Sequence, residues 1–252
     1  MDFLDYNIFV PSKNRINNCS TILNAGQFKL NIVVEPQDYE AYKNKFQEHN
    51  IIALPENNKG ITYVRNFIKQ YTEQNGLQYY WQLDDDITGI YHREDTKLIK
   101  SGYSNLLDAK LQFEQNNIAL GALEYRQFAW SASKPLVNNS FCDSCVYVNN
   151  VLTNGLRYNV YVEGKEDRDF AIQVISKNLK TARTTLYAFS APPNGSNAGG
   201  LKEIFYDIGK ESKCADRMVE VWGENICQKI IKDTGRVDVK INWNNINKPS
   251  LF

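Results

Sequence analysis

"YYWQLDDDITGI", residues 79–90, joins an aromatic and apolar run to three consecutive acids, Asp84, Asp85 and Asp86. The run before the acids has the composition of a buried β-strand. If the chain is still extended there, Asp84 and Asp86 point to one side and Asp85 to the other. A short acidic turn exposed to water is the simpler alternative. Like charges beside a buried strand cost stability unless a cation compensates them, so the stretch favours a ligand-binding strand end.

This stretch ends the last of four apolar runs that alternate with helical patterns. The predicted strands cover residues 6–10, 28–34, 51–54 and 77–83. Two helical patterns lie between them, one after Pro36 and one that ends at Gly76, with apolar side chains at spacings of three and four. Strands that alternate with helices predict a mostly parallel sheet with helices on its faces. Such sheets bind ligands at the carboxyl ends of their strands, which is where the acids lie.

Length and composition limit the class of protein. A chain of 252 residues with 42% hydrophobic content can bury a full core, and we expect one domain. Its 29 acidic and 29 basic residues balance, so nucleic-acid binding would need a local basic patch. Five cysteines are an odd number, which favours reduced thiols over a disulfide framework. Because no apolar run reaches roughly 18 residues and no signal-peptide pattern is present, we expect a cytoplasmic protein.

The acid triplet predicts a metal site. Two carboxylates on one side of a strand end offer hard oxygen ligands to Mg²⁺ or Mn²⁺, which bind one or two protein carboxylates together with substrate phosphates. A diphosphate would supply the remaining ligands. By contrast, the pair Cys142 and Cys145 has no second pair or histidine cluster beside it, so it does not favour zinc.

A second group of acids opens a predicted helix in "VEGKEDRDFAIQVISKN", residues 162–178. Glu166, Asp167 and Asp169 lie near its N-terminus, where the helix dipole favours acids for structural reasons alone. A carboxylate at the edge of a crevice can also take a proton from an attacking hydroxyl. Spacing does not choose between Glu166 and Asp167 for that role.

Together these motifs resemble one family. "VPSKNR", "VVEPQDYEAY", "LPENNKGITYVRNFI", "WQLDDDI" and "EGKEDRDF" are similar, in this order, to the TET-associated glycosyltransferases, a group linked to bacteriophage DNA hypermodification. The resemblance covers roughly residues 6–206. It implies the GT-A fold, a Rossmann-like α/β/α sandwich with a mostly parallel central sheet. Residues 1–252 would form a single domain, with a nucleotide-sugar-binding half at 1–91 and an acceptor-binding half with a C-terminal extension at 92–252.

The resemblance also implies roles for individual residues. Asp86 would be a direct ligand of Mn²⁺ or Mg²⁺, with Asp84 as a second ligand or facing the ribose. In inverting members of the fold the aspartate of the Glu-Asp motif removes the acceptor proton, which points to Asp167, beside Glu166, as general base. Glycine pairs like Gly199 and Gly200 belong to a loop over the donor. The nucleotide sugar would contact Pro11, Ser12, Lys13, Arg15, Arg65, Asn66, Asp84 and Asp85. For Arg65 a solvated helix face is the alternative.

The implied substrates are a nucleotide sugar, with a UDP-sugar favoured, and DNA that carries a hydroxymethylated pyrimidine, most simply 5-hydroxymethylcytosine. The implied location is the host cytoplasm if the chain is phage-encoded. Tyr125, Phe128 and Trp130, near Arg126, could stack on an extruded base, but "LEYRQFAW" alternates like an ordinary strand and we expect core side chains there. Basic residues in 177–185 and 229–240 could contact phosphate or be ordinary surface.

Other functions remain open at this stage. A glycosyltransferase of the same fold could act on a small molecule, a glycan or a protein. A nucleotidyltransferase could use the same metal and diphosphate, although "VPSKNRINN" is not a glycine-rich phosphate loop. A non-catalytic protein that binds a nucleotide sugar is the third alternative.

Overall fold

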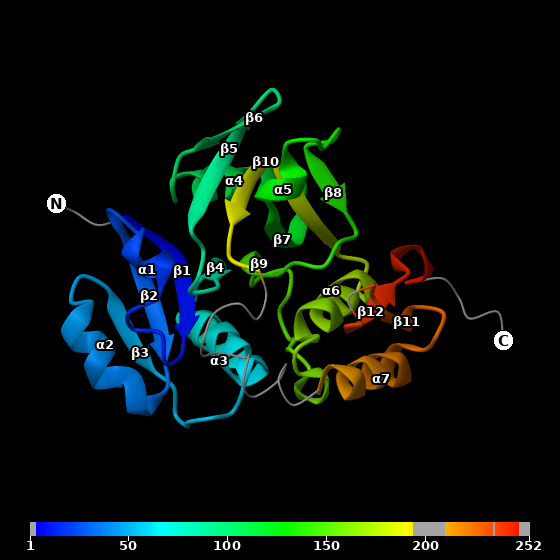
Figure 1. Ribbon diagram of the computed structural model, residues 1–252, viewed down its shortest axis with the longest axis horizontal. Helices are drawn as coiled ribbons and strands as arrows, with labels where there is room; N and C mark the ends of the chain where they lie inside the picture. The colour runs from blue at the N-terminus through cyan, green and yellow to red at the C-terminus, as the bar shows by residue number, and fades with distance from the viewer. Residues whose placement is uncertain (1–3, 194–209, 234, 247–252) are drawn as a thin grey trace.

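The computed structural model describes residues 4–193, 210–233 and 235–246 (Figure 1). Its first half alternates strands and helices, as predicted. The strands are β1 (Leu4–Ser12), β2 (Phe28–Val34), β3 (Asn50–Ala53) and β4 (Tyr79–Leu83). The helices between them are α1 (Ser20–Leu23), α2 (Tyr39–Lys45) and α3 (Ile61–Gln74), with Pro36 opening a 3-10 turn before α2. Gly76, with φ of 69°, follows the end of α3 in the left-handed conformation that glycine adopts without strain.

The second half completes one large sheet. Its elements are β5 (Gly89–Glu94), β6 (Lys97–Lys100), α4 (Asn105–Gln115), β7 (Ile118–Tyr125), α5 (Arg126–Ala129), β8 (Leu136–Asn138), β9 (Cys145–Asn149), α6 (Glu166–Ser176) and β10 (Lys180–Ser190). The strand order is β3-β2-β1-β4-β9-β7-β10-β5-β6, and β8 also pairs with β10. Strands β3, β2, β1 and β4 are parallel neighbours. The predicted α/β fold with a mostly parallel central sheet is confirmed.

The direction of the strands brings four chain segments to one edge of the sheet. Strand β9 is antiparallel to both β4 and β7, so β4 and β7 run the same way, and β10 is parallel to β7. The carboxyl ends of β1, β4 and β7 therefore meet the beginning of β9. This edge holds the acid triplet.

Side chains from alternate strand positions fill two cores, one on each face of the sheet. In β1, Ile8 and Val10 belong to one core and Phe9 to the other. The first core includes buried side chains of α1, α2 and α4, and the second includes those of α3 and α6. The sheet is thus the middle layer of an α/β/α sandwich.

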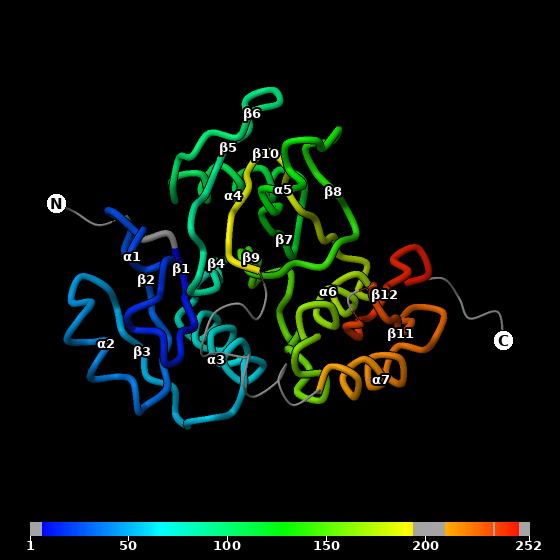
Figure 2. Tube along the Cα trace, in the orientation of Figure 1, coloured from blue at the N-terminus to red at the C-terminus, as the bar shows by residue number. Residues whose placement is uncertain are grey.

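The C-terminal elements pack on the outer side of α6. They are α7 (Lys210–Trp222), β11 (Cys227–Ile231) and β12 (Val237–Ile241). Ile172 and Ile175 of α6 share a core with Ala215 and Met218 of α7 and with Val239 of β12. Figure 2 shows this group at the opposite end of the molecule from β1–β3. None of the helices in the described ranges combines the length and hydropathy of a membrane span.

The strand predicted for "LEYRQFAW", residues 123–130, is correct only for its first three residues. Strand β7 ends at Tyr125, and the chain continues as the short helix α5. Ala129 of α5 packs inward against Ala188 and Tyr91, while Phe128 and Trp130 are each 56% exposed. The apparent alternation in "LEYRQFAW" is therefore not the alternation of a strand, and these two aromatics are not core side chains. Gly199 and Gly200 lie outside the described residues.

Candidate active site

The backbone of the acid triplet is held from two sides. The Thr21 hydroxyl of α1 accepts a hydrogen bond from the Ile87 N–H (2.8 Å) and donates one to the Asp84 carbonyl (2.5 Å). On the opposite side the Asp84 N–H donates to the Ser144 carbonyl (2.7 Å), just before β9. These hydrogen bonds hold the backbone just beyond the end of strand pairing at Leu83, and the chain turns immediately after Asp84. The chain is thus not extended through the three acids, so the condition for strand-like alternation of their side chains is not met.

Asp85 is directed into the protein. It is 5% exposed, its Oδ2 accepts a hydrogen bond from the Ser12 hydroxyl (2.6 Å), and its Oδ1 accepts one from Arg15 Nη1 (2.6 Å). Burial raises the pKa of this carboxyl, and Arg15 opposes that shift. Because both carboxylate oxygens are engaged inside the protein, Asp85 is placed to order the loop after β1, and its predicted contact with the nucleotide sugar does not fit this geometry.

The loop after β1 is ordered by a chain of hydroxyl groups. Since the Ser12 proton goes to Asp85, the Tyr42 hydroxyl donates to Ser12 Oγ (2.8 Å) and accepts from the Arg15 N–H (3.3 Å). Pro11 precedes this loop as a half-buried residue of β1, opposite Val33 of β2.

Lys13 lies on the other side of the same loop. Its Nζ contacts Glu35 Oε1 (2.9 Å) and Asn58 Oδ1 (2.6 Å). Glu35 is 4% exposed and also accepts a hydrogen bond from the Asn58 N–H (2.8 Å). The predicted contacts Pro11, Ser12, Lys13 and Arg15 thus line the ends of β1 and β2 and the loop after β3.

Two arginines compensate the acid cluster. Besides Asp85, Arg15 Nη1 contacts Asp86 Oδ2 (3.4 Å). Burial raises the pKa of Asp84, and the positive charge of Arg65 in α3 is the largest effect that lowers it. The protein's own guanidinium groups therefore supply part of the compensating charge. The pKa values of Asp84 and Asp85 remain raised despite these arginines, so a bound cation would stabilise their charged forms further.

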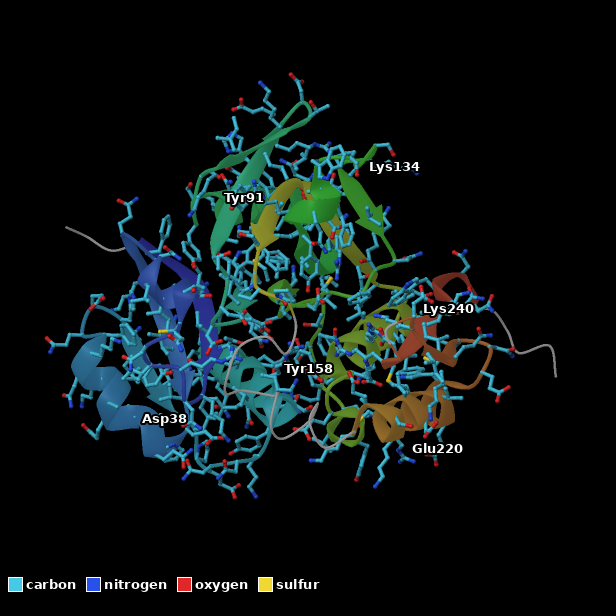
Figure 3. The ribbon with its side chains drawn as sticks, in the orientation of Figure 1. Asp38, Tyr91, Lys134, Tyr158, Glu220 and Lys240 are labelled. Carbon is cyan, nitrogen blue, oxygen red and sulfur yellow. The ribbon has the colours of Figure 1, made fainter. Side chains whose placement is uncertain are left out.

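Arg65 joins α3 to α6 in the interior. Only 6% of Arg65 and 3% of Glu166 is exposed, and Arg65 Nη1 lies 3.3 Å from Glu166 Oε1. The guanidinium also lies over the Tyr158 ring, 5.7 Å from its centroid. Figure 3 shows Tyr158 between the helices α3 and α6. A solvated helix face, the alternative for Arg65, is thus wrong.

Asn66 has a structural partner. Its side-chain amide donates to the Tyr158 carbonyl (2.8 Å) and accepts from the Tyr158 N–H (2.8 Å). Its predicted contact with the nucleotide or diphosphate therefore does not match its position, because the amide instead holds the segment before α6 against α3.

Glu166 and Asp167 have different surroundings, which sequence spacing did not reveal. Burial raises the pKa of Glu166 to about 7, although Arg65 lowers it. Asp167 is half-buried, and no hydrogen bond or ion pair joins its side chain to another described residue. Glu166 is thus a buried partner of Arg65, whereas Asp167 presents an unengaged carboxylate at the start of α6.

Asp143 adds another carboxylate at this end of the sheet. It precedes β9 and accepts hydrogen bonds from Arg183 Nη2 (2.7 Å) and the Tyr125 hydroxyl (3.0 Å). Burial raises its pKa, Arg183 lowers it, and the nearby charges of Asp167 and Asp84 raise it further. Asp84, Asp143 and Asp167 therefore influence one another electrostatically, although the outer two are 83 positions apart in the sequence.

Comparison with known families matches this chain over residues 6–200 to the TET-Associated Glycosyltransferase family. The chain belongs to the TET-associated glycosyltransferase family. It is therefore a glycosyltransferase, and a nucleotide sugar is its class of donor. The match includes the acid triplet, Arg65 and the Glu166–Asp167 pair, and it ends before α7.

Solved structures similar to this glycosyltransferase are distant. A putative nucleotide-diphospho-sugar transferase from Desulfovibrio desulfuricans G20 has 10% identity and a TM-score of 0.41, covering 70% of this chain and 78% of its own. A197 from STIV has 11% identity and a TM-score of 0.42, covering 76% and 85%. The glycosyltransferase GlyE of Streptococcus pneumoniae TIGR4 has 9% identity and a TM-score of 0.38, covering 88% and 50%. No curated protein matches the sequence of this chain.

The carboxylates of this glycosyltransferase fit a divalent cation in their chemistry. Asp84 and Asp86 offer hard oxygen ligands, and the charge of Asp86 raises the pKa of Asp84, so the two carboxylates are close. Within the described ranges, no three His, Cys, Asp or Glu side chains group to hold an ion by themselves. The pair thus fits a cation that takes its other ligands from a diphosphate.

Sequence reasoning missed Asp143 in this glycosyltransferase. It counted Arg183 only among the basic residues of 177–185 that would contact phosphate or lie on the surface, whereas Arg183 is 7% exposed and paired with acids. Asp143 lies inside the Cys-x-x-Cys stretch, whose two cysteines are buried free thiols. Arg183 lies in β10, where its Nη1 also contacts Glu124 Oε1 (3.1 Å). Asp143 interrupts the strand-like sequence "FCDSCVYV", and Arg183 is a charged residue inside β10. That contradiction with a strand pattern was the signal that could have drawn attention to them.

Proposed function

We propose that this glycosyltransferase moves a sugar from a UDP-sugar to the hydroxyl of 5-hydroxymethylcytosine in DNA, with Mn²⁺ or Mg²⁺ as cofactor. The observation that supports this reaction best is the Asp167 carboxylate, which has no hydrogen bond or ion pair with another described residue and whose charge, like that of Asp84, raises the pKa of Asp143. A candidate proton acceptor is therefore within electrostatic reach of the groups that would bind the diphosphate.

The donor half uses the loop after β1 and the acid triplet. Arg15 carries a guanidinium group that can pair with phosphate oxygens, and the buried Arg65 adds positive charge that acts on Asp84. Asp84 and Asp86 would hold the divalent cation, which when bound neutralises charge that develops on the departing diphosphate. Lys13, held by Glu35 and Asn58, contributes a further positive charge at the same edge.

The transfer step places the acceptor proton on Asp167. The acceptor oxygen forms a bond to the anomeric carbon, the bond from that carbon to the diphosphate oxygen breaks, and the Asp167 carboxylate takes the hydroxyl proton. This sequence inverts the anomeric configuration. Glu166 does not serve as the base in this proposal, because its carboxyl is buried against Arg65.

The acceptor is proposed from the family, whose members are linked to DNA hypermodification. A pyrimidine inside a duplex is out of reach of a crevice, so the target base must be extruded or presented in a single strand. The balanced charge of the chain gives no overall attraction to DNA, so phosphate contacts must be local.

Mass spectrometry of nucleosides tests the function. DNA containing 5-hydroxymethylcytosine is incubated with the protein and a panel of UDP-sugars, with Mn²⁺ or with a chelator, and then digested to nucleosides. The expected product is a glycosylated nucleoside that requires both donor and metal. DNA with unmodified cytosine is the control, since it lacks the acceptor hydroxyl.

Other results would point to the alternatives. Release of UDP with no sugar on DNA would indicate another acceptor. Transfer of a nucleotide in place of a sugar would indicate a nucleotidyltransferase. Donor binding without any UDP release, with or without DNA, would contradict the proposed reaction.

A further inference from the structure

A pocket of about 480 Å³ lies where β7 and β10 end and α5 begins. Its volume falls within the range of small-molecule sites. None of its lining residues belongs to the donor half of the site. The residues that line it include Tyr125, Arg126, Gln127, Trp130, Phe189 and Ser190.

The pocket combines flat aromatic surfaces with an exposed arginine side chain. The rings of Tyr125 and Phe189 are in contact, with centroids 4.5 Å apart, and Trp130 is 56% exposed. Arg126 is exposed and lies over the Tyr91 ring, 4.7 Å from its centroid, and no carboxylate pairs with it in the described part of the chain. Figure 3 shows Tyr91 on β5, beside α5. Exposed tryptophan with an adjacent unpaired arginine is typical of surfaces that stack nucleobases.

Two hydrogen bonds join the lining of this pocket to the acidic end of the sheet. The Tyr125 hydroxyl donates to Asp143 (3.0 Å), whose pKa is raised by the charge of Asp167. Thr88, two residues after the triplet, donates from its N–H to the Ser190 carbonyl (2.7 Å). The pocket is therefore joined through its lining residues to Asp143 and to the loop that follows the acid triplet.

We propose that this pocket binds the acceptor pyrimidine of a nucleic acid strand, with the base stacked on Trp130 and the neighbouring phosphate at Arg126. The exposed Gln127 amide lies at the same rim and can hydrogen-bond to the edge of the base. This inference rests on the proposed function, because it takes DNA as the acceptor, and it assigns residues that the donor site does not use.

Binding of a short fluorescent single strand tests the pocket. The probe carries one central 5-hydroxymethylcytosine, and fluorescence anisotropy gives its Kd with wild-type and variant protein. Trp130→Ala is expected to raise Kd by about tenfold or more, because a stacking surface is lost. Arg126→Gln is expected to raise Kd and to reduce the slope of log Kd against log salt by roughly 0.7, as for one lost phosphate contact.

Two controls make the result specific. Tyr161→Ala removes another aromatic side chain that is 70% exposed and whose ring lies under the guanidinium of Arg217 in α7. This variant should leave Kd unchanged. A strand with an abasic site at the central position should lose most of its dependence on Trp130. An equal effect of Trp130→Ala on the abasic strand would overturn the stacking assignment, as would a wild-type protein that binds no strand.

Failure of the pocket and failure of the proposed function give different results. If Trp130→Ala transfers sugar to DNA with an unchanged acceptor KM, the proposed role of the pocket is overturned, but the proposed function is not. If the protein binds the DNA strand in a way that depends on Trp130 but transfers no sugar to any DNA, the assignment of the pocket is supported and the proposed function is overturned. Circular dichroism of each variant checks that the fold is retained.

Discussion

At the scale of single residues, Asp167 carries the proposed chemistry. Asp167→Asn should lower kcat by about 10²- to 10⁴-fold, since a general base contributes that much and an amide cannot take the proton. Asp169→Asn is a matched control in the same helix, because Asp169 accepts hydrogen bonds from Trp222 (2.8 Å) and Gln173 (2.6 Å) and has a structural role. Initial rates of UDP release measure both. Wild-type turnover in Asp167→Asn would eliminate this residue as the base.

Glu166 should make stability depend on pH. Its folded pKa, raised by burial to about 7, exceeds the unfolded value of 4.5, so the folded state binds up to one more proton between these values. The contribution of Glu166 to the free energy of unfolding is therefore complete below pH 4.5 and is lost as pH rises through 7. Urea unfolding of wild type and Glu166→Gln across this range should show a difference that changes with pH. A constant difference would contradict the raised pKa.

At the scale of elements, β12 holds the N-terminus of α6. Asp238 is 5% exposed, its Oδ1 lies 2.8 Å from Lys165 Nζ, and it also contacts Arg168. These two cations flank Glu166 and Asp167 in the sequence. Burial raises the pKa of Asp238, but Arg168, Lys165 and Lys232 lower it far more, so it is ionised in the folded protein. Asp238 is thus a positioning residue for the start of α6.

Asp238→Asn should both destabilise the protein and slow the reaction. Loss of one partner from a buried ion pair costs about 3–5 kcal/mol, because the remaining charges stay buried without compensation. We expect a lower urea midpoint and a lower kcat, with donor KM changed much less. Asp238→Glu should restore part of kcat, whereas exposed Asp233→Asn in the same hairpin should change neither. A variant with reduced stability but normal kcat would show that the contact does not position Asp167.

At the scale of the whole molecule, the C-terminal elements belong to the folded core although the family match ends before them. Removal of residues 207–252 would expose Val162, Ile172 and Ile175, which are at most 7% exposed. Each such side chain contributes about 1.5–3 kcal/mol when buried, so the total approaches the net stability of an ordinary domain. The truncated chain should therefore have a much lower Tm. Thermal unfolding with an unchanged Tm would show that residues 1–206 fold independently.

The sequence by itself determined the parts of the fold that depend on local pattern. Strand β2 has the predicted bounds 28–34, and α3 ends just before Gly76, because apolar periodicity and helix-ending residues act through near neighbours in the chain. The same pattern placed the acid triplet at the carboxyl end of β4 and Glu166 with Asp167 at the start of a helix. The quoted motifs were also enough to indicate the family.

Only the tertiary structure decided which charges meet. Arg15 compensates Asp85 across 70 residues of chain, and Arg183 of β10 reaches Asp143 across 40, distances over which no periodicity carries information. In the folded chain the side chains of Asp85 and Asn66 also point inward. Phe128 and Trp130 are exposed because α5 replaces the end of the predicted strand. Ion pairs and pockets form between segments that the sheet order brings together, and that order is a property of the whole packed chain.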